Sequence, residues 1–431
     1  MYRKIMGFLE AWKENEHRKP LILQGARQVG KTYSILEFGR THYENVAYFN
    51  FETNPKLNET FEENISPDYL IPILSHIAGQ TIVKEKTLIV FDEIQLCERA
   101  LTSLKYFCED APDYHIIVAG SLLGVAVNRA KFSFPVGKVD MKTLYPMDME
   151  EFMIAMGESD LAEQIKKCFE TNQPMSAALH DAAMQLYRQY LVVGGMPECV
   201  MQFVQTRDYI LIRHTQDTIL ASYLNDMSKY NNLNEIKKTR LAYDNITVQL
   251  SKKNTRFQYK LIKKGGRASE FENAIEWLCL SGIVSQVYRV EQIKKPLENY
   301  RDIDAFKIYV SDLGLLCAKK DLVANDILYM VEELNDFKGG MTENYVNVQL
   351  TINGYNTYYW ESERGAEIDF VIQREGQLIP IEVKSADNTR AKSLKVYMDT
   401  YKPAYAIKLS AKNFAFEDNK KVVPLYAAFC I

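Results

Sequence analysis

The sequence predicts an α/β fold in which a buried parallel sheet comes first, and a helical region and a second, mixed α/β part follow. Three short apolar runs predict the first sheet, namely residues 20–23, 88–91 and 115–119. Runs of this kind are typical of strands that are buried on both faces. A turn with two glycines follows the first run, and an acidic pair follows the second. Because open α/β sheets bind ligands at the carboxyl ends of their strands, both features point to one site.

The turn after the first run carries a phosphate-binding pattern. Residues 22–32 read Ile-Leu-Gln-Gly-Ala-Arg-Gln-Val-Gly-Lys-Thr, which fits Gly-x4-Gly-Lys-Ser/Thr, the pattern of a P-loop. Glycines let backbone N–H groups approach a polyphosphate, and the helix that follows points its positive end at the phosphates. We expect Lys31 to contact the β- and γ-phosphates and Thr32 to bind Mg²⁺. The residues predicted to bind ATP are Gly25, Ala26, Arg27, Gln28, Val29, Gly30, Lys31 and Thr32.

The acidic pair predicts hydrolysis in addition to binding. Asp92 and Glu93 directly follow the buried run 88–91. We expect Asp92 to hold the Mg²⁺ shell and Glu93 to be the general base that activates the attacking water. Two acids could instead end a strand in solvent, but their place about 60 residues after a P-loop favours the catalytic roles.

A third run, residues 115–119, ends at Gly120 and Ser121. We expect this strand beside the P-loop strand, with Ser121 placed to sense the γ-phosphate or to orient the water. A helix cap is the alternative role for Ser121. Another strand candidate, residues 46–51, lies between the P-loop and the acidic pair. This order of strands favours the ATPase division that uses a catalytic glutamate.

These motifs resemble those of a family of prokaryotic AAA-type ATPases. The resemblance lies in residues 25–32, in Phe91-Asp92-Glu93-Ile94-Gln95 and in Gly120-Ser121, and more weakly in residues 145–147 and 194–197. It extends over the full length of the chain. It implies an ATPase domain at 1–150, a helical lid at 151–232, a winged-helix region at 233–320 and a restriction-endonuclease-like domain at 321–431.

Composition limits the classes of partner. The chain has 431 residues, of which 47% are hydrophobic and 25% charged, enough for two or three globular domains. A net charge of −4 means that any nucleic-acid contact needs a local basic patch. No apolar run reaches 18 residues, so we expect no membrane contact and a cytoplasmic location. The seven cysteines lack CxxC spacing, which predicts reduced core thiols without zinc or a disulfide.

The middle of the chain is predicted to form helices first and then a winged helix. Residues 151–232 look like the lid helices of AAA-type ATPases. The winged helix is predicted from an apolar helix stripe around Ile275 and from two strands, residues 283–290 and 306–310, that form the wing.

A basic segment lies inside this winged-helix region. Lys252–Arg267 holds seven basic residues and no acid, with Phe257 and Tyr259 interleaved. This composition predicts either contact with the DNA backbone or a solvated face. Four further cations are candidates for an arginine-finger contact in cis or from another copy, which makes an oligomer compatible with the sequence; they are Arg129, Lys138, Arg207 and Arg213.

The last part of the chain carries a pattern that resembles PD-(D/E)xK nucleases. Asp369 lies in a predicted strand, Glu382 and Lys384 end the next apolar run, and Glu343 begins a predicted helix after Gly339-Gly340. Strand alternation places Glu382 and Lys384 on one face, and a hairpin brings Asp369 beside them. Glu343, Asp369 and Glu382 could then hold Mg²⁺ while Lys384 helps to activate water. The alternative is a retained fold that binds DNA or a protein without catalysis.

Together these features predict a Mg²⁺-dependent AAA-type ATPase whose conformational change acts through the winged helix and the nuclease-like domain on DNA. The alternative is an ATP-gated regulatory switch whose C-terminal domain is a non-catalytic protein- or DNA-binding module. A third hypothesis is a DNA nuclease in which ATP is only regulatory. Replacement of Glu93 by Gln distinguishes the first two hypotheses, because a motor loses its activity and a switch is locked in its ATP form.

Overall fold

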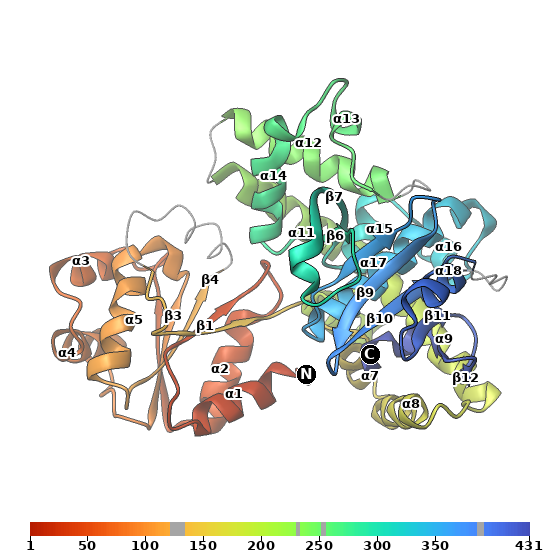
Figure 1. Cartoon of the computed structure of the whole chain (residues 1–431). Helices are drawn as coiled ribbons and strands as arrows, with labels where there is room; N and C mark the ends of the chain where they lie inside the picture. Colours follow the sequence, from red (N-terminus) through yellow and green to blue (C-terminus); the bar gives the residue numbers. More distant parts are fainter. Residues whose placement is uncertain (121–133, 230–232, 251–255, 386–391) are drawn as a thin grey trace. The chain divides into compact units, whose positions relative to one another are not determined.

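The computed structural model describes residues 1–120, 134–229, 233–250, 256–385 and 392–431 (Figure 1). These residues form two compact units. The N-terminal unit comprises Tyr2–Tyr145 with Leu280–Gly282, and the C-terminal unit comprises Pro146–Cys279 and Ile283–Ile431. The first boundary lies close to the predicted one at residue 150. The three parts predicted after it, 151–232, 233–320 and 321–431, cluster into one compact unit.

The described strands of the N-terminal unit form a parallel sheet of five strands in the order β2-β3-β4-β1-β5. The predicted neighbour relation holds, because β4, the strand before Ser121, pairs with the P-loop strand β1. Strands β3 and β4 are buried along their whole length, as their apolar runs predict. The strands are β1 (Leu21–Gln24), β2 (Asn45–Asn50), β3 (Thr87–Asp92), β4 (His115–Gly120) and β5 (Asp140–Thr143).

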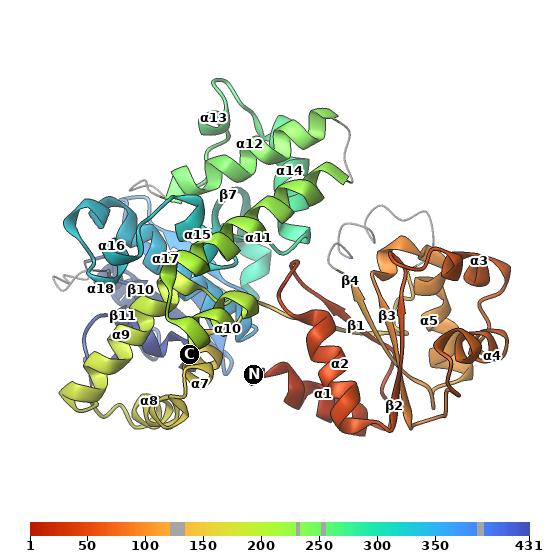
Figure 2. The ribbon, with the colours of Figure 1, turned by 180° about the vertical axis from the view of Figure 1, so that it is seen from behind.

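Helices cover both faces of this sheet. In Figures 1 and 2, α1 and α2 lie on one face and α3, α4 and α5 lie on the other. The rings of Phe51, Phe61 and Phe91 pack against one another with centroids 5.6–5.8 Å apart beneath the second set. Burial of each such ring contributes about 1.5–3 kcal/mol. The helices are α1 (Ile5–Glu14), α2 (Lys31–His42), α3 (Lys56–Glu63), α4 (Pro67–Ala78) and α5 (Glu98–Asp110), with a short η1 (Ile94–Leu96).

The C-terminal unit combines many helices with a mixed sheet. Its described strands form an eight-stranded sheet in the order β12-β13-β11-β10-β9-β8-β6-β7. The strands are β6 (Val284–Val290), β7 (Arg301–Val310), β8 (Tyr358–Glu361), β9 (Glu367–Arg374), β10 (Gln377–Val383), β11 (Ala406–Ser410), β12 (Ala415–Glu417) and β13 (Lys420–Pro424). The α-helices are α7 (Met149–Ala155), α8 (Ser159–Thr171), α9 (Ala177–Val193), α10 (Pro197–Thr206), α11 (Tyr209–Lys229), α12 (Leu233–Leu250), α13 (Tyr259–Ile262), α14 (Ala268–Leu280), α15 (Leu313–Lys319), α16 (Ala324–Leu328), α17 (Asn335–Ile352) and α18 (Lys392–Tyr401).

The two strands predicted as a wing have a different setting. Strands β6 and β7 do pair with each other as an antiparallel hairpin. However, β6 also pairs in parallel with β8, which makes the hairpin one edge of the C-terminal sheet. A local periodicity reveals a strand but not its second neighbour, so the sequence did not show that residues 233–320 and 321–431 share a sheet.

The helix predicted to begin near Glu343 starts earlier, and the expectation of a start after Gly339-Gly340 is corrected. Helix α17 begins at Asn335 and contains both glycines. A Cβ at Gly340 would lie 2.1 Å from the carbonyl oxygen of Leu250, whereas a Cβ at Gly339 would meet nothing within 4 Å. Gly340 therefore serves a close approach of two backbones rather than a helix boundary.

The Gly194-Gly195-Met196-Pro197 turn joins α9 to α10 and holds the start of the C-terminal unit. The N–H of Met147 donates to the Gly195 carbonyl at 2.7 Å, and the Tyr190 hydroxyl donates to the Met147 carbonyl at 2.7 Å. The buried Asp312 carboxylate accepts from the Gly195 N–H at 2.7 Å. A side chain at Gly195 would meet the Met147 carbonyl oxygen at 2.0 Å, so glycine is required here.

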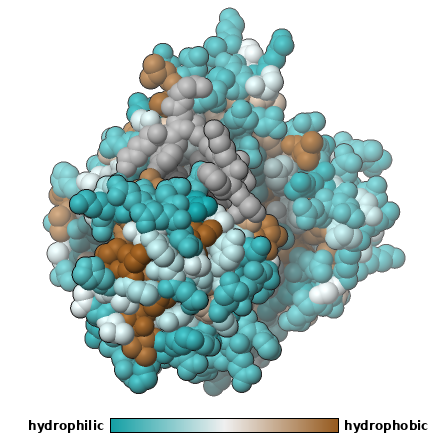
Figure 3. Space-filling model, turned by 90° about the vertical axis from the view of Figure 1, so that its left-hand side faces the viewer, coloured by the Kyte–Doolittle hydropathy of each residue, from teal (hydrophilic) through white to brown (hydrophobic). Residues whose placement is uncertain are grey.

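The face drawn in Figure 3 is mostly hydrophilic, with apolar residues in a few small patches, as is ordinary for a globular surface. All seven cysteines are free thiols. Within the described parts of the chain, no helix combines the length and the apolar character of a membrane-spanning segment.

Candidate nucleotide site and C-terminal polar cluster

The P-loop follows β1 and adopts a backbone that its glycines permit. Gly25 has φ 147°, Gly30 has φ 90° and Gln28, between them, has φ 65°. A Cβ at Gly25 would lie 2.1 Å from the Leu144 carbonyl oxygen, so only glycine fits. Helix α2 begins at Lys31, directly after the loop. Its free N–H groups and positive end are therefore directed at the loop, as phosphate binding requires.

Lys31 is held within the loop. Its Nζ donates to the carbonyl oxygens of Gly25 at 2.9 Å and Ala26 at 2.8 Å, and the residue is buried. Arg3 supports the same loop, because its Nη1 donates to the Val29 carbonyl at 2.9 Å and its Nη2 to the Tyr145 carbonyl at 2.8 Å. The sequence analysis missed Arg3, since nothing local to Arg3 indicates a partner 26 residues away.

Thr32 and Asp92, the two residues predicted to bind Mg²⁺ here, are in direct contact. The Thr32 hydroxyl donates to Asp92 Oδ2 at 2.9 Å, which joins α2 to the end of β3. The Tyr48 hydroxyl on β2 donates to the same oxygen at 2.8 Å. Burial raises the pKa of Tyr48 to about 12, so the phenol keeps the proton that it donates. One hydroxyl and one carboxylate side by side fit a Mg²⁺ ion, which takes few protein ligands and completes its shell with water and phosphate oxygens.

Glu93 occupies an unusual backbone conformation beside this pair. Its φ of 53° is rare for a residue with a side chain and is typical of positions that the surrounding fold holds for function. Gln95 Nε2 donates to its carboxylate. Burial and the nearby Asp92 carboxylate raise the pKa of Glu93. A raised pKa suits a general base.

The structure thus brings four predicted residues together: Lys31, Thr32, Asp92 and Glu93. Ser121 lies outside the described residues, as does Arg129. The other arginine-finger candidates have partners in their own unit. Lys138 pairs with Glu109 at 2.8 Å, Arg213 with Asp321 at 3.2 Å, and Arg207 lies over the Phe203 ring.

The C-terminal polar cluster lies on β9, β10 and α17. The hairpin of β9 and β10 is antiparallel as predicted, and β10 pairs in parallel with β11. Lys384 Nζ lies 3.0 Å from Glu382 Oε1, which confirms that the two side chains share a face. The Val383 N–H donates to Asp369 Oδ2 at 2.7 Å. Burial and the Glu343 carboxylate raise the pKa of Asp369 to about 7.

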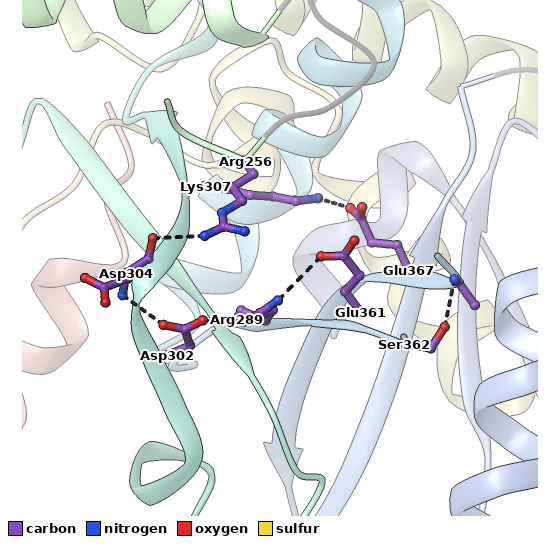
Figure 4. A network of polar contacts seen from close by, with 9 residues as sticks. Arg256, Arg289, Asp302, Asp304, Lys307, Glu361, Ser362 and Glu367 are labelled. Carbon is purple, nitrogen blue, oxygen red and sulfur yellow. Dashed lines mark hydrogen bonds and ion pairs between the residues drawn. The ribbon is translucent and has the colours of Figure 1, made fainter. Parts of the chain in front are cut away.

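A fifth member, which the sequence analysis did not identify, is Lys307 on β7. Its Nζ lies 3.4 Å from Glu343 Oε2 and pairs with Glu367 Oε1 (Figure 4). Burial opposes its charge, but the carboxylates of Glu343, Glu367 and Asp369 raise the pKa of Lys307 well above its ordinary value. The sequence analysis predicted only a strand here, and no local signal marks the ionic partners of Lys307.

The assignment of Glu343, Asp369 and Glu382 as metal ligands stays a prediction. Among the described residues, no three or more His, Cys, Asp or Glu side chains are grouped as they would be around a metal ion. The carboxylates have partners within the protein instead: Lys307 and Tyr309 for Glu343, a backbone N–H for Asp369 and Lys384 for Glu382.

The basic segment Lys252–Arg267 is described from Arg256 onward. Its aromatic residues are not presented to a ligand: Phe257 is buried, and its ring stacks on Phe306 with centroids 5.4 Å apart. Four of the described cations are exposed, namely Lys260, Lys263, Lys264 and Arg267. Lys263 pairs with Glu270 at 3.2 Å.

Comparison with known families divides the chain into three segments. A family model described as an AAA domain matches residues 17–153. Two further models, both described as domains of unknown function, match residues 184–326 and 338–428. A search of curated proteins gives no match.

Three solved structures similar to the chain are all of low sequence identity. A Walker-type ATPase of Pyrococcus abyssi is 13% identical, with a TM-score of 0.45 over 74% of this chain and 95% of that one. The ORC2 protein of Aeropyrum pernix is 12% identical, with a TM-score of 0.36 over 79% and 95%. RuvB of Thermotoga maritima is 16% identical, with a TM-score of 0.29 over 65% and 87%. The match of residues 17–153 to an AAA domain agrees with the parallel sheet and with the P-loop that follows β1.

Proposed function

We propose that the N-terminal unit binds ATP with Mg²⁺ and hydrolyses it. The observation that carries the proposal is the 2.9 Å hydrogen bond from Thr32 to Asp92, because it places the residue after the P-loop lysine against the acidic strand. Both oxygens are then available to one cation. When bound, Mg²⁺ would supply the charge that neutralises the phosphate oxygens.

The other residues take roles that follow from their positions. Lys31 exchanges its loop carbonyls for phosphate oxygens and neutralises charge in the transition state. Tyr48 and Thr32 orient the Asp92 carboxylate. Glu93 accepts the proton of the attacking water, and Ser121 senses the γ-phosphate.

The proposal is tested by comparing Glu93→Gln with Glu59→Gln, an exposed acid on α3 of the same unit. We expect Glu93→Gln to retain ATP binding and to lose about 100-fold or more of the hydrolysis rate. Glu59→Gln should be close to wild type. Unchanged hydrolysis in Glu93→Gln would contradict the role of the base.

We further propose that ATP turnover changes the C-terminal unit and that this unit contacts DNA. The exposed cations Lys260, Lys264 and Arg267 supply the local charge that an acidic chain needs for this contact. Replacing all three by Ala should weaken DNA binding and flatten its dependence on salt. Replacement of the exposed Lys392 and Lys395 on α18 by Ala is the control. If the control loses as much DNA affinity as the first variant, residues 260–267 have no special role in DNA binding.

The second candidate function is an ATP-gated switch with a non-catalytic C-terminal module. The pairing of Lys307 with Glu343 favours it, because a predicted metal ligand already has a protein cation. Under this alternative, Glu93→Gln holds the ATP state and stays active in the cell, whereas a motor is inactivated.

A further inference from the structure

A protein cation lies within the C-terminal cluster. Lys307 is only 1% exposed, and its Nζ is 3.4 Å from Glu343 Oε2. Tyr309 lies two residues further along β7, on the same face, and its hydroxyl donates to the same Glu343 oxygen at 2.9 Å. Figure 4 shows the Lys307 side chain pointing toward Glu367, to which it is also paired. The ammonium thus bridges a helix carboxylate and a strand carboxylate.

The position of this ammonium is fixed by packing. In the sheet order, β6 and β8 lie between β7 and β9, so Lys307 must reach across the sheet to contact Glu367. It does so above the Tyr359 ring of β8, with Nζ 5.1 Å from the ring centroid. A buried ammonium is tolerated only where carboxylates and aromatic faces compensate it. Lys307 has both, and it is almost fully shielded from solvent.

The two remaining acids of the cluster, Asp369 and Glu382, also have partners within the protein. Asp369 accepts from the Val383 N–H, and Glu382 Oε1 pairs with Lys384. Glu382 Oε2 is buried without a hydrogen-bond partner among the described residues. A metal ion would bind this oxygen first. However, the two acids that would share the metal already have partners: Glu343 pairs with Lys307, and Asp369 accepts from a backbone amide.

We infer that the ammonium of Lys307 takes the place of a divalent cation in this cluster, and that the C-terminal unit is complete without a metal. Lys307 belongs to the segment 184–326 and the acids belong to the segment 338–428. The first segment therefore supplies the counter-ion of the second. The C-terminal unit then acts by binding and not by metal-dependent phosphodiester cleavage, and this inference stands independently of ATP hydrolysis at Lys31.

The test uses the full, nucleotide-free chain with Asp92→Asn, so that the first site contributes no metal. Hydrogen exchange of the β9 and β10 amides is followed with and without millimolar Mn²⁺. We expect the Asp92→Asn parent to show no change on adding Mn²⁺. Adding Lys307→Met should speed exchange about tenfold or more, and Mn²⁺ should restore protection because it replaces the lost cation. A further Asp369→Asn change should abolish that rescue.

Lys384→Met is the matched control, because Lys384 pairs with one acid and its side chain is 33% exposed. It should give a smaller increase in exchange and no rescue by Mn²⁺. If Lys307→Met fails to fold, Lys307→Gln serves with the same expectation. Protection of the parent by Mn²⁺ that Asp369→Asn removes would overturn the inference. So would a Lys307→Gln chain whose exchange Mn²⁺ leaves unchanged.

Discussion

The two predicted metal sites of this chain differ in where their positive charge comes from. At the P-loop, Thr32 and Asp92 bond to each other, and Lys31 Nζ donates to two backbone carbonyls of its own loop. These contacts can be exchanged for a ligand at little cost. In the C-terminal cluster, a buried lysine pairs with Glu343 and Glu367. Exchange there would leave a buried ammonium without partners.

The difference shows that the same residue types, two carboxylates and a lysine, can form a ligand site or a closed ionic core. Distance and burial decide between them. A motif fixes which residues are present, but the cation that fills the cluster comes from a strand outside the motif. Changes in each site should therefore have different signatures, in catalysis for the first and in stability for the second.

The largest expected effect is on stability at Lys307. Lys307→Met leaves the mostly buried Glu343 carboxylate without its counter-ion and should lower the free energy of unfolding by about 3–5 kcal/mol. Chemical denaturation with the C-terminal transition as readout measures it. Lys384→Met should cost clearly less, because Lys384 is partly solvated. Equal losses in the two variants would contradict the central position of Lys307.

The next effect is on catalysis at the P-loop. Lys31→Ala removes the charge that should meet the phosphates, and ATP hydrolysis should fall by about 100- to 1000-fold. The unfolding free energy should change less than for Lys307→Met, because the hydrogen bonds that Lys31 donates to Gly25 and Ala26 lie within one loop. Steady-state phosphate release measures the loss. Lys84→Ala, at an exposed pair with Asp113 in the same unit, is the control and should retain the full rate.

Two adjacent glycines in α17 give a matched pair on the stability side. Gly340→Ala puts a methyl group 2.1 Å from the Leu250 carbonyl oxygen and should destabilise by about 1–3 kcal/mol. Gly339→Ala meets nothing and should stabilise the helix by about 0.5–1 kcal/mol. Thermal unfolding of both variants measures the opposite signs. If both substitutions destabilise the protein, the conclusion that Gly339 lies within the helix without a special role would be contradicted.

The smallest expected effect is the contribution of His115 to the pH dependence of the N-terminal unit. Burial lowers the pKa of His115 to about 4, below its unfolded value, so the unfolded state takes up a proton at a higher pH than the folded state. The stability that His115 contributes should be constant above about pH 7 and fall by about 1–2 kcal/mol between pH 7 and pH 5. His115→Asn should remove this slope, and His76→Asn, at an exposed position on α4, should leave it unchanged. The free energy of unfolding of the wild type and of both variants, measured at pH 7 and at pH 5, tests this expectation.

How far the sequence predicts the molecule depends on how local the signal is. Three features are encoded by consecutive residues, and all three were located correctly: the P-loop strand, the strand that ends at Asp92 and the strand before Ser121. The partners that complete each site come from distant residues: Arg3 for the loop, Tyr48 for Asp92 and Lys307 for Glu343. None of these three has a motif, because each acts through contacts with residues that are far away in the sequence.

The edge of the C-terminal sheet shows the same limit. The hairpin of β6 and β7 was predicted as two strands, but its parallel contact with β8 depends on residues about 70 positions away. That contact is also what brings Lys307 to the acids. The unpredicted part of the fold and the unpredicted part of the site therefore have one cause.

The central claim is that one of the two sites takes a metal ion and the other does not. The most direct measurement counts the Mn²⁺ ions bound by the wild-type chain in the presence of a non-hydrolysable ATP analogue. We predict a single ion per chain that requires the nucleotide, is lost in Thr32→Ala and persists in Asp369→Asn. A second ion that binds without nucleotide and is lost in Asp369→Asn would contradict the claim.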